Sequence, residues 1–150
     1  MLPTVNQIAR IENADGDVYA ILSYQPSLNY LLMKWIGFCT DEELKQATLH
    51  MLKWQQTEGD PYNCRVHVHD TKEFDVAWVD TVDWIVNDFF DKAYDAGLRL
   101  NISVLSPDLF SKLSSEALFQ QLGSKVPTQL FETLEAAESW IRNNGSTLNS

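Results

Sequence analysis

Hydrophobic and polar positions follow two different periods along this chain, and the period changes several times. Residues 18–24 and 28–36 are rich in side chains that suit a pleated surface, and the Gln-Pro-Ser break between them fits a hairpin connection. Thr40 then stands three residues before Glu43, a pattern in which the two side chains cap the start of a helix. The apolar positions that follow at helical spacing are Leu44, Ala47, Met51 and Trp54. The pattern predicts two antiparallel strands followed by a helix that ends near Gly59.

The rest of the chain alternates between strand and helix patterns. Further strands are predicted at residues 64–70, 98–105 and 126–131, and further helices at residues 78–93, 107–119 and 133–141. A polar loop at residues 71–76 leads into the first of these helices. The order ββαβαβαβα favours an α/β fold with a mixed sheet. A chain of 150 residues fits a single domain, with its core at about 17–142, a lead-in at 1–16 and a frayed tail at 143–150.

Two consecutive predicted strands alternate strictly between polar and apolar side chains. Arg65, His67 and His69 share one face of the first strand, and Val66 and Val68 share the other. The second strand has Arg99, Asn101 and Ser103 on its polar face and Leu98, Leu100, Ile102 and Val104 on its apolar face. An interior parallel strand covered on both faces is typically apolar throughout. We therefore expect helices mainly on the apolar face, with the polar face open to water or to a partner.

The overall charge makes this polar face unusual. The chain has 21 acidic and 11 basic residues, and its net charge of -10 argues against nucleic acid as a partner. Arg65, His67, His69 and Arg99 are predicted to form a locally basic patch. Two interpretations stay open: the patch keeps a water-facing sheet soluble, or it docks a protein partner, a small ligand or a second copy of the chain to form a homodimer.

Other chemical signals in the sequence are weak. His67 and His69, with Asp70 nearby, form an incomplete set of metal ligands, which is the alternative of a small metal-binding protein or enzyme. Asp70 also ends a predicted strand, where α/β sheets commonly bind ligands. The chain contains no glycine-rich phosphate loop, nucleophile elbow or zinc-type cysteine spacing. We therefore predict no catalytic residue, no bound metal and no cofactor.

Compartment signals favour the cytoplasm. Cys39 and Cys64 form no disulfide framework, which is typical of a reducing compartment. The first residues lack the apolar segment of a signal peptide, and no run of about 18 apolar residues occurs. We expect a cytoplasmic protein without a membrane span.

Several short segments also carry a family resemblance. They are residues 34–37 (Lys-Trp-Ile-Gly), 40–43 (Thr-Asp-Glu-Glu), 96–99 (Ala-Gly-Leu-Arg), 106–108 (Ser-Pro-Asp) and 131–140, together with Asp70 and Trp84. Over about residues 17–142 the chain resembles the SpoIIAA-like, or STAS-like, group of small α/β proteins. The resemblance implies a mixed sheet with helices mainly on one side.

The same resemblance implies a non-catalytic binding or regulatory role. The group includes bacterial regulators that bind partner proteins and are switched by phosphorylation of a Ser or Thr after the third strand, and other relatives look like lipid or small-ligand carriers. Thr71 keeps a hydroxyl at the corresponding place, but the Asp-Ser-Ser/Thr-Gly sequence of those regulators is missing. The predicted site for a protein partner or small ligand comprises Arg65, His67, His69, Asp70, Thr71, Arg99 and Asn101.

Overall fold

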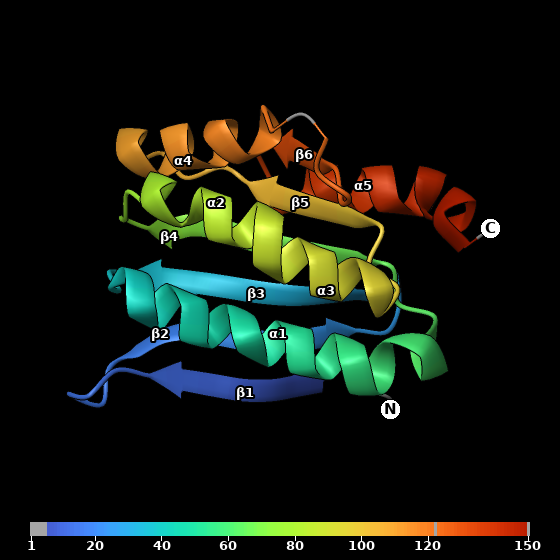
Figure 1. Ribbon diagram of the computed structural model, residues 1–150, viewed down its shortest axis with the longest axis horizontal. Coiled ribbons are helices and arrows are strands. Elements are labelled where there is room, and N and C mark those ends of the chain that lie inside the picture. Colours follow the sequence, from blue (N-terminus) through green and yellow to red (C-terminus); the bar gives the residue numbers. More distant parts are fainter. Residues whose placement is uncertain (1–5, 122, 150) are drawn as a thin grey trace.

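The strands of the sheet lie side by side in the order in which they occur along the chain (Figure 1). The computed structural model describes residues 6–121 and 123–149. The strands are β1 (Asn6–Glu12), β2 (Val18–Gln25), β3 (Tyr30–Gly37), β4 (Val66–Phe74), β5 (Leu100–Val104) and β6 (Thr128–Phe131). β1, β2 and β3 are antiparallel neighbours, whereas β3, β4, β5 and β6 run parallel. The chain is therefore an α/β protein with a mixed sheet, as predicted.

Four helices accompany the sheet in the described part of the chain. They are α1 (Asp41–Tyr62), a continuous helix at residues 82–95, α4 (Leu109–Phe119) and α5 (Leu134–Asn144). The second consists of α2 (Val82–Trp84), a π-helical segment (Ile85–Phe89) and α3 (Phe90–Asp95), and is named the α2–α3 helix below. Short 3₁₀ turns occupy Val79–Thr81 and Gly145–Asn149.

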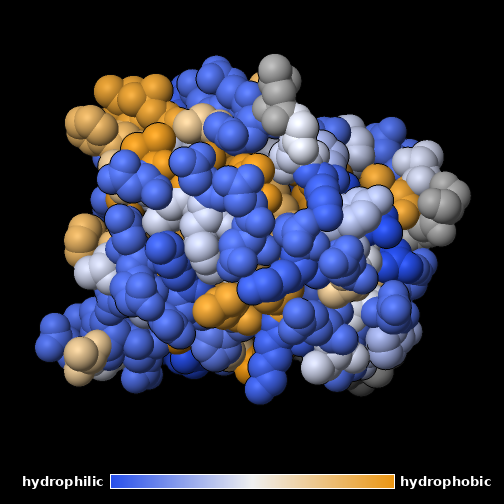
Figure 2. All heavy atoms as spheres, in the orientation of Figure 1, coloured by the Kyte–Doolittle hydropathy of each residue, from blue (hydrophilic) through white to orange (hydrophobic). Residues whose placement is uncertain are grey.

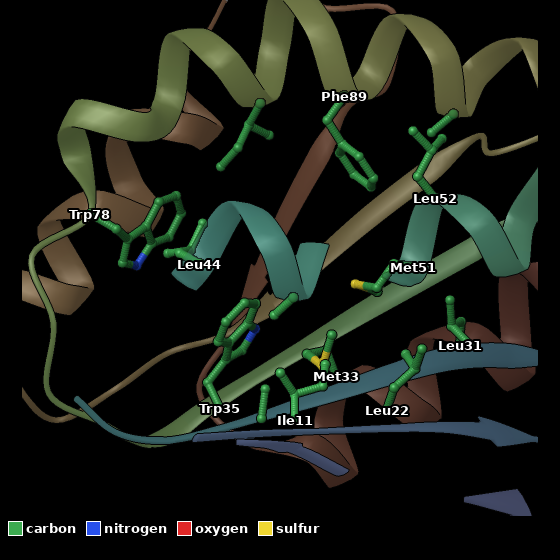
Figure 3. Close-up of a cluster of buried hydrophobic side chains, with 14 of the residues drawn as sticks. Ile11, Leu22, Leu31, Met33, Trp35, Leu44, Met51, Leu52, Trp78 and Phe89 are labelled. Atoms are coloured by element: carbon green, nitrogen blue, oxygen red, sulfur yellow. The ribbon is translucent and has the colours of Figure 1, made fainter. Parts of the chain in front are cut away.

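The helices cover both faces of the sheet, but most of them lie on one. α1 and the α2–α3 helix lie in front of the sheet in Figure 1, and α4 lies beside the turn that precedes α2. Figure 3 shows Met33 and Trp35 of β3 pointing toward Leu44 and Met51 of α1, with Phe89 above them. α5 packs on the opposite face, where its side chains join a smaller core with residues of β4 and β5. The expectation of helices mainly on one face is therefore confirmed.

Two segments differ from the sequence prediction. The lead-in expected at residues 1–16 contains the edge strand β1, and its residues 1–5 lie outside the described residues. β1 has two register shifts against β2 and buries Ile11, so it lacks the regular alternation that identifies a strand. β4 continues to Phe74 through the expected loop at residues 71–76, because the Phe74 side chain packs in the core.

Thr40 begins α1 as the sequence predicts. Its hydroxyl accepts a hydrogen bond of 3.1 Å from the Glu43 N–H, and the Glu43 carboxylate accepts one of 2.9 Å from the Thr40 N–H. We expect Thr40→Ala to lower the free energy of unfolding by about 1 kcal/mol, because a helix N–H loses its partner. Urea unfolding followed by circular dichroism measures this loss. Thr57→Ala, at an exposed position inside the same helix, is the control, and an equal loss in both variants would contradict the capping role.

Candidate functional site

The polar face that was expected to be open is buried beneath the helix layer. The exposed fractions of His67 and Asn101 are 0% and 1%. His67 contacts Gln55 of α1 and Phe89 of the α2–α3 helix, whereas Val68 lies on the face that α5 covers. The expectation of a face open to water is wrong, because the alternation along β4 and β5 separates two buried environments rather than protein from solvent. This face is also not free for a second copy of the chain.

The arginines of the expected basic patch bind nearby backbone instead. Arg65 Nη1 donates to the Gly97 carbonyl at 3.3 Å and lies 3.4 Å from the Asp60 carboxylate. Arg99 Nη1 donates to the Tyr94 carbonyl at 2.8 Å, and the guanidinium lies 4.0 Å from the centre of the Tyr94 ring. Both arginines therefore secure the connection between α3 and β5, and no basic patch forms with His67 and His69.

The histidines of β4 are neutral and already hydrogen-bonded. Gln55 Nε2 donates to the Cys64 carbonyl, so the Gln55 Oε1 atom accepts from His67 Nε2 at 2.9 Å. Trp35 Nε1 donates to His69 Nδ1 at 3.0 Å. Burial lowers the pKa of His67 to about 3 and the pKa of His69 to about 4. Neither imidazole carries a charge at neutral pH.

A cavity of about 30 Å³ lies between the sheet and the helices, toward the carboxyl ends of β3, β4 and β5. Its polar lining comes from His69 and Thr71 of β4 and from Asn101 and Ser103 of β5. The remaining lining residues are Trp35, Leu44, Thr48, Phe74, Trp78, Ile85, Phe89, Phe90 and Leu118. Ligands of α/β proteins commonly bind at the carboxyl ends of the strands. The cavity is thus one candidate site.

Asp70 does not join this cavity. It lies on the opposite face of β4 from His69, and its carboxylate accepts a hydrogen bond of 3.1 Å from the Lys72 N–H. The structure therefore separates the three residues of the expected metal set. Among the described residues, no group of three or more His, Cys, Asp or Glu side chains is placed to hold a metal ion.

Thr71 faces the interior and is not presented as a modification site. Its exposed fraction is 2%, and its hydroxyl donates to the Val104 carbonyl at 2.5 Å. A phosphate on this oxygen would break that hydrogen bond and would bring charge into a buried site. Thr71, predicted as part of a site for a partner or small ligand, therefore lies in the interior.

The cysteines are buried and free. Burial raises the pKa of the Cys39 thiol to about 12 and the pKa of the Cys64 thiol to about 11. Both thiols are protonated at neutral pH, which removes the thiolate that nucleophilic catalysis needs.

α4 exposes apolar side chains and buries polar ones. The exposed fractions of Leu109, Phe110 and Leu113 are 60%, 64% and 49%. Its buried residues are Ser111, Ser114, Ser115 and Leu118. Ser114 accepts a hydrogen bond of 2.8 Å from the Trp78 N–H, so this serine holds the loop before α2. The polarity of α4 is the reverse of what a surface helix normally shows.

The turn before α2 adds one exposed apolar residue beside the apolar face of α4. Val79, in the turn that contacts α4, is 51% exposed. Figure 2 shows hydrophobic residues gathered at the upper left of the molecule, where α4 begins in Figure 1. The patch is named the α4 patch below and comprises Val79, Leu109, Phe110 and Leu113.

No family model, curated protein or solved structure matches this chain. The SpoIIAA-like resemblance accordingly stays a prediction. None of the described helices is both long enough and apolar enough to cross a membrane.

Sequence reasoning missed the α4 patch, although a signal for it exists. The leucine spacing predicts the helix correctly, but it does not say which side of the helix is buried. Ser111, Ser114 and Ser115 lie together on the side opposite Leu109 and Leu113. A run of small serines on one side allows that side to approach the sheet closely, and this was the available signal.

Proposed function

We propose that this chain is a non-catalytic binding module of SpoIIAA-like type that docks a protein partner on the α4 patch. The observation that carries the proposal is the reversed polarity of α4, which leaves Leu109, Phe110 and Leu113 in water. Burying such a side chain is worth about 1.5–3 kcal/mol, and contiguous exposed apolar patches mark interaction surfaces. The resemblance supports the same role, because the regulators of that group bind partner proteins. The two free cysteines support a cytoplasmic location as part of this proposal.

Charge indicates what kind of partner fits. Asp80 is exposed directly after Val79, and Asp108 begins α4. The net charge of -10 attracts a basic partner and repels an acidic one, including a second copy of this chain. An amphipathic helix with an apolar stripe and basic flanks therefore complements the patch in both respects.

A synthetic peptide tests this surface directly. We expect a fluorescent peptide with leucine and lysine at helical spacing to bind saturably in fluorescence anisotropy, and more weakly as salt is added. The double substitution Phe110→Ser with Leu113→Ser should weaken binding by about tenfold or more, because it removes apolar contact while the net charge stays the same.

The controls separate this site from general stickiness. Leu49→Ser changes an exposed leucine of α1 and should leave the affinity unchanged. Docking on α4 would be contradicted if the double variant bound the peptide as tightly as the wild type does. It would also be contradicted if a peptide of the same composition in scrambled order bound the wild type equally well. If the wild type sediments as a dimer and the double variant sediments as a monomer, the patch is the interface of a homodimer instead.

A further inference from the structure

The helices leave part of one sheet face uncovered. Of the described helices, α5 is the one that lies on the face opposite α1, and it packs on β5 and β6. In Figure 1 it lies beside these strands and away from β1 and β2. Ile21 of β2 and Ile36 of β3 are half-buried and belong to neither hydrophobic core. On β1, β2 and the second half of β3, this face therefore has no helix over it in the described part of the chain.

The register of the strands places four side chains in one row across this uncovered face. Arg10 of β1 lies opposite Ile21 of β2, and Ile21 lies opposite Lys34 of β3. Lys34 in turn lies opposite Asp70 of β4. Trp35, the neighbour of Lys34, points toward α1, so Lys34 and the rest of the row point to the other side of the sheet. The row is named the back-face row below.

The two ends of the back-face row carry opposite charges, and neither end is in an ion pair. Arg10 is exposed and forms no ion pair with another described residue. Asp70 forms none with these residues either, and its carboxylate accepts a hydrogen bond from the Lys72 N–H. Lys34, between them, is paired with Glu73 at 2.8 Å. The row therefore has an unpaired positive end and an unpaired negative end.

We propose that this face binds a second copy of the chain, related by a twofold axis that runs parallel to the strands between β2 and β3. Such an axis exchanges the two ends of the row, so Arg10 faces the partner's Asp70 and Asp70 faces the partner's Arg10. Packed sheets lie about 10 Å apart, a gap that an arginine and an aspartate side chain span together. Ile21 then packs on the aliphatic part of the partner's Lys34. This dimer goes beyond the docking function of the α4 patch and does not depend on it.

The distribution of charge allows two acidic chains to meet at this face. The net charge of -10 opposes self-association in general. α1 and the α2–α3 helix carry far more acidic than basic residues, and both helices lie on the other face of the sheet. On the uncovered face Arg10 and Lys34 balance Asp70 and Glu73. Two copies that approach through this face therefore keep their most acidic surfaces far apart.

Charge reversal tests the pairing directly. In sedimentation equilibrium of the whole protein we expect a monomer–dimer equilibrium. Arg10→Asp should weaken the dimer by about tenfold or more, because each copy then places an aspartate against the partner's Asp70. Asp70→Arg should weaken it to a similar extent. The two substitutions combined exchange the charges and should restore the dimer to wild-type strength, whereas damage to the fold by one substitution would not be repaired by the other.

A variant at the centre of the row keeps the test decisive if Asp70→Arg fails to fold. Ile21→Lys places a lysine against the partner's Lys34 and should also weaken the dimer by about tenfold or more. Leu49→Lys makes a matched change at an exposed leucine of α1 and should leave the dimer unchanged.

The remaining control separates the contact from the overall charge. Lys53→Asp, at an exposed position of α1, changes the net charge by the same amount as Arg10→Asp and should leave the dimer unchanged. The proposal is overturned if the wild type stays monomeric throughout the micromolar range, or if the combined reversal does not restore the dimer. It is also overturned if Lys53→Asp weakens the dimer as much as Arg10→Asp does, or if the double substitution on the α4 patch abolishes the dimer.

Discussion

Lowering the pH from about 7 to about 5 is expected to reduce the free energy of unfolding by roughly 3 kcal/mol, because the fully buried His67 and the partly buried His69 both stay neutral in the folded protein. In the unfolded chain both imidazoles titrate near their ordinary pKa of 6.5, whereas in the folded protein the pKa of His67 is about 3 and that of His69 about 4. Between these values the unfolded state binds more protons than the folded state. Their contribution is therefore fully present above pH 6.5 and is lost progressively as the pH falls below it.

Urea unfolding at both pH values measures this effect. His67→Gln and His69→Gln should each remove about half of the difference between the two pH values, because each removes one of the two titrating groups. His50→Gln, which changes an exposed histidine of α1, is the matched control. If the difference is as large in the His67→Gln and His69→Gln variants as in the wild type, the acid sensitivity belongs to other groups.

Phe89→Ala is expected to lower the free energy of unfolding by about 3–5 kcal/mol, a large share of the stability of a domain of this size. The Phe89 side chain is 1% exposed. Its ring lies 6.3 Å from the rings of His67 and Trp84 and 5.7 Å from the ring of Phe90, measured between ring centres. Truncation removes these contacts and leaves a void next to an existing cavity, so the loss should fall in the upper part of the range.

Phe110→Ala makes the same chemical change at a side chain that is 64% exposed. It should change the free energy of unfolding by no more than about 0.5 kcal/mol. The midpoints of urea unfolding compare the two variants, provided that the free energy of unfolding depends on urea concentration with the same slope in both. A large loss of stability in both variants would mean that Phe110 is covered in solution. A small loss in both variants would mean that the Phe89 side chain contributes little to the stability of the fold.

The sequence predicts most elements of this fold because their ends carry local chemical signals. Thr40 and Glu43 make both hydrogen bonds that their spacing indicates. Gly97 ends the α2–α3 helix with a φ of 108°, a conformation that favours glycine. The π-helical form of Ile85–Phe89 carries no such signal, because its apolar residues also fit an ordinary helix.

The candidate site was harder to predict, because its residues obtain their environment from distant parts of the chain. His67 and His69 have strand spacing, and the sequence shows correctly that they share a face. Their partners are Gln55, 12 residues away, and Trp35, 34 residues away. Alternation along a strand reports that two faces differ, but it does not report what covers either face. The interpretation of these histidines as surface groups failed for this reason.

α4 shows the same limit from the opposite direction. Leu109 and Leu113 have the spacing of a buried stripe, yet they lie in water while Ser114 packs inward and binds the Trp78 N–H. Periodicity locates a stripe on the helix surface, whereas the loop and strands around the helix decide which stripe is buried. The exposed stripe is therefore the feature for which folding alone gives no reason.

The order of the strands also has a consequence for how the chain folds. Each strand of the sheet pairs with the strand that precedes it in sequence, so no late strand has to insert between two earlier ones. The β2–β3 hairpin forms between close neighbours in the chain, and α1, with 22 residues, then carries the chain back to add β4 in parallel. Pairing between consecutive strands keeps the segment that each new pairing must close as short as this topology allows, and a shorter segment loses less entropy on closure. During synthesis the sheet can grow strand by strand from its N-terminal half, and each new strand finds its template already in place.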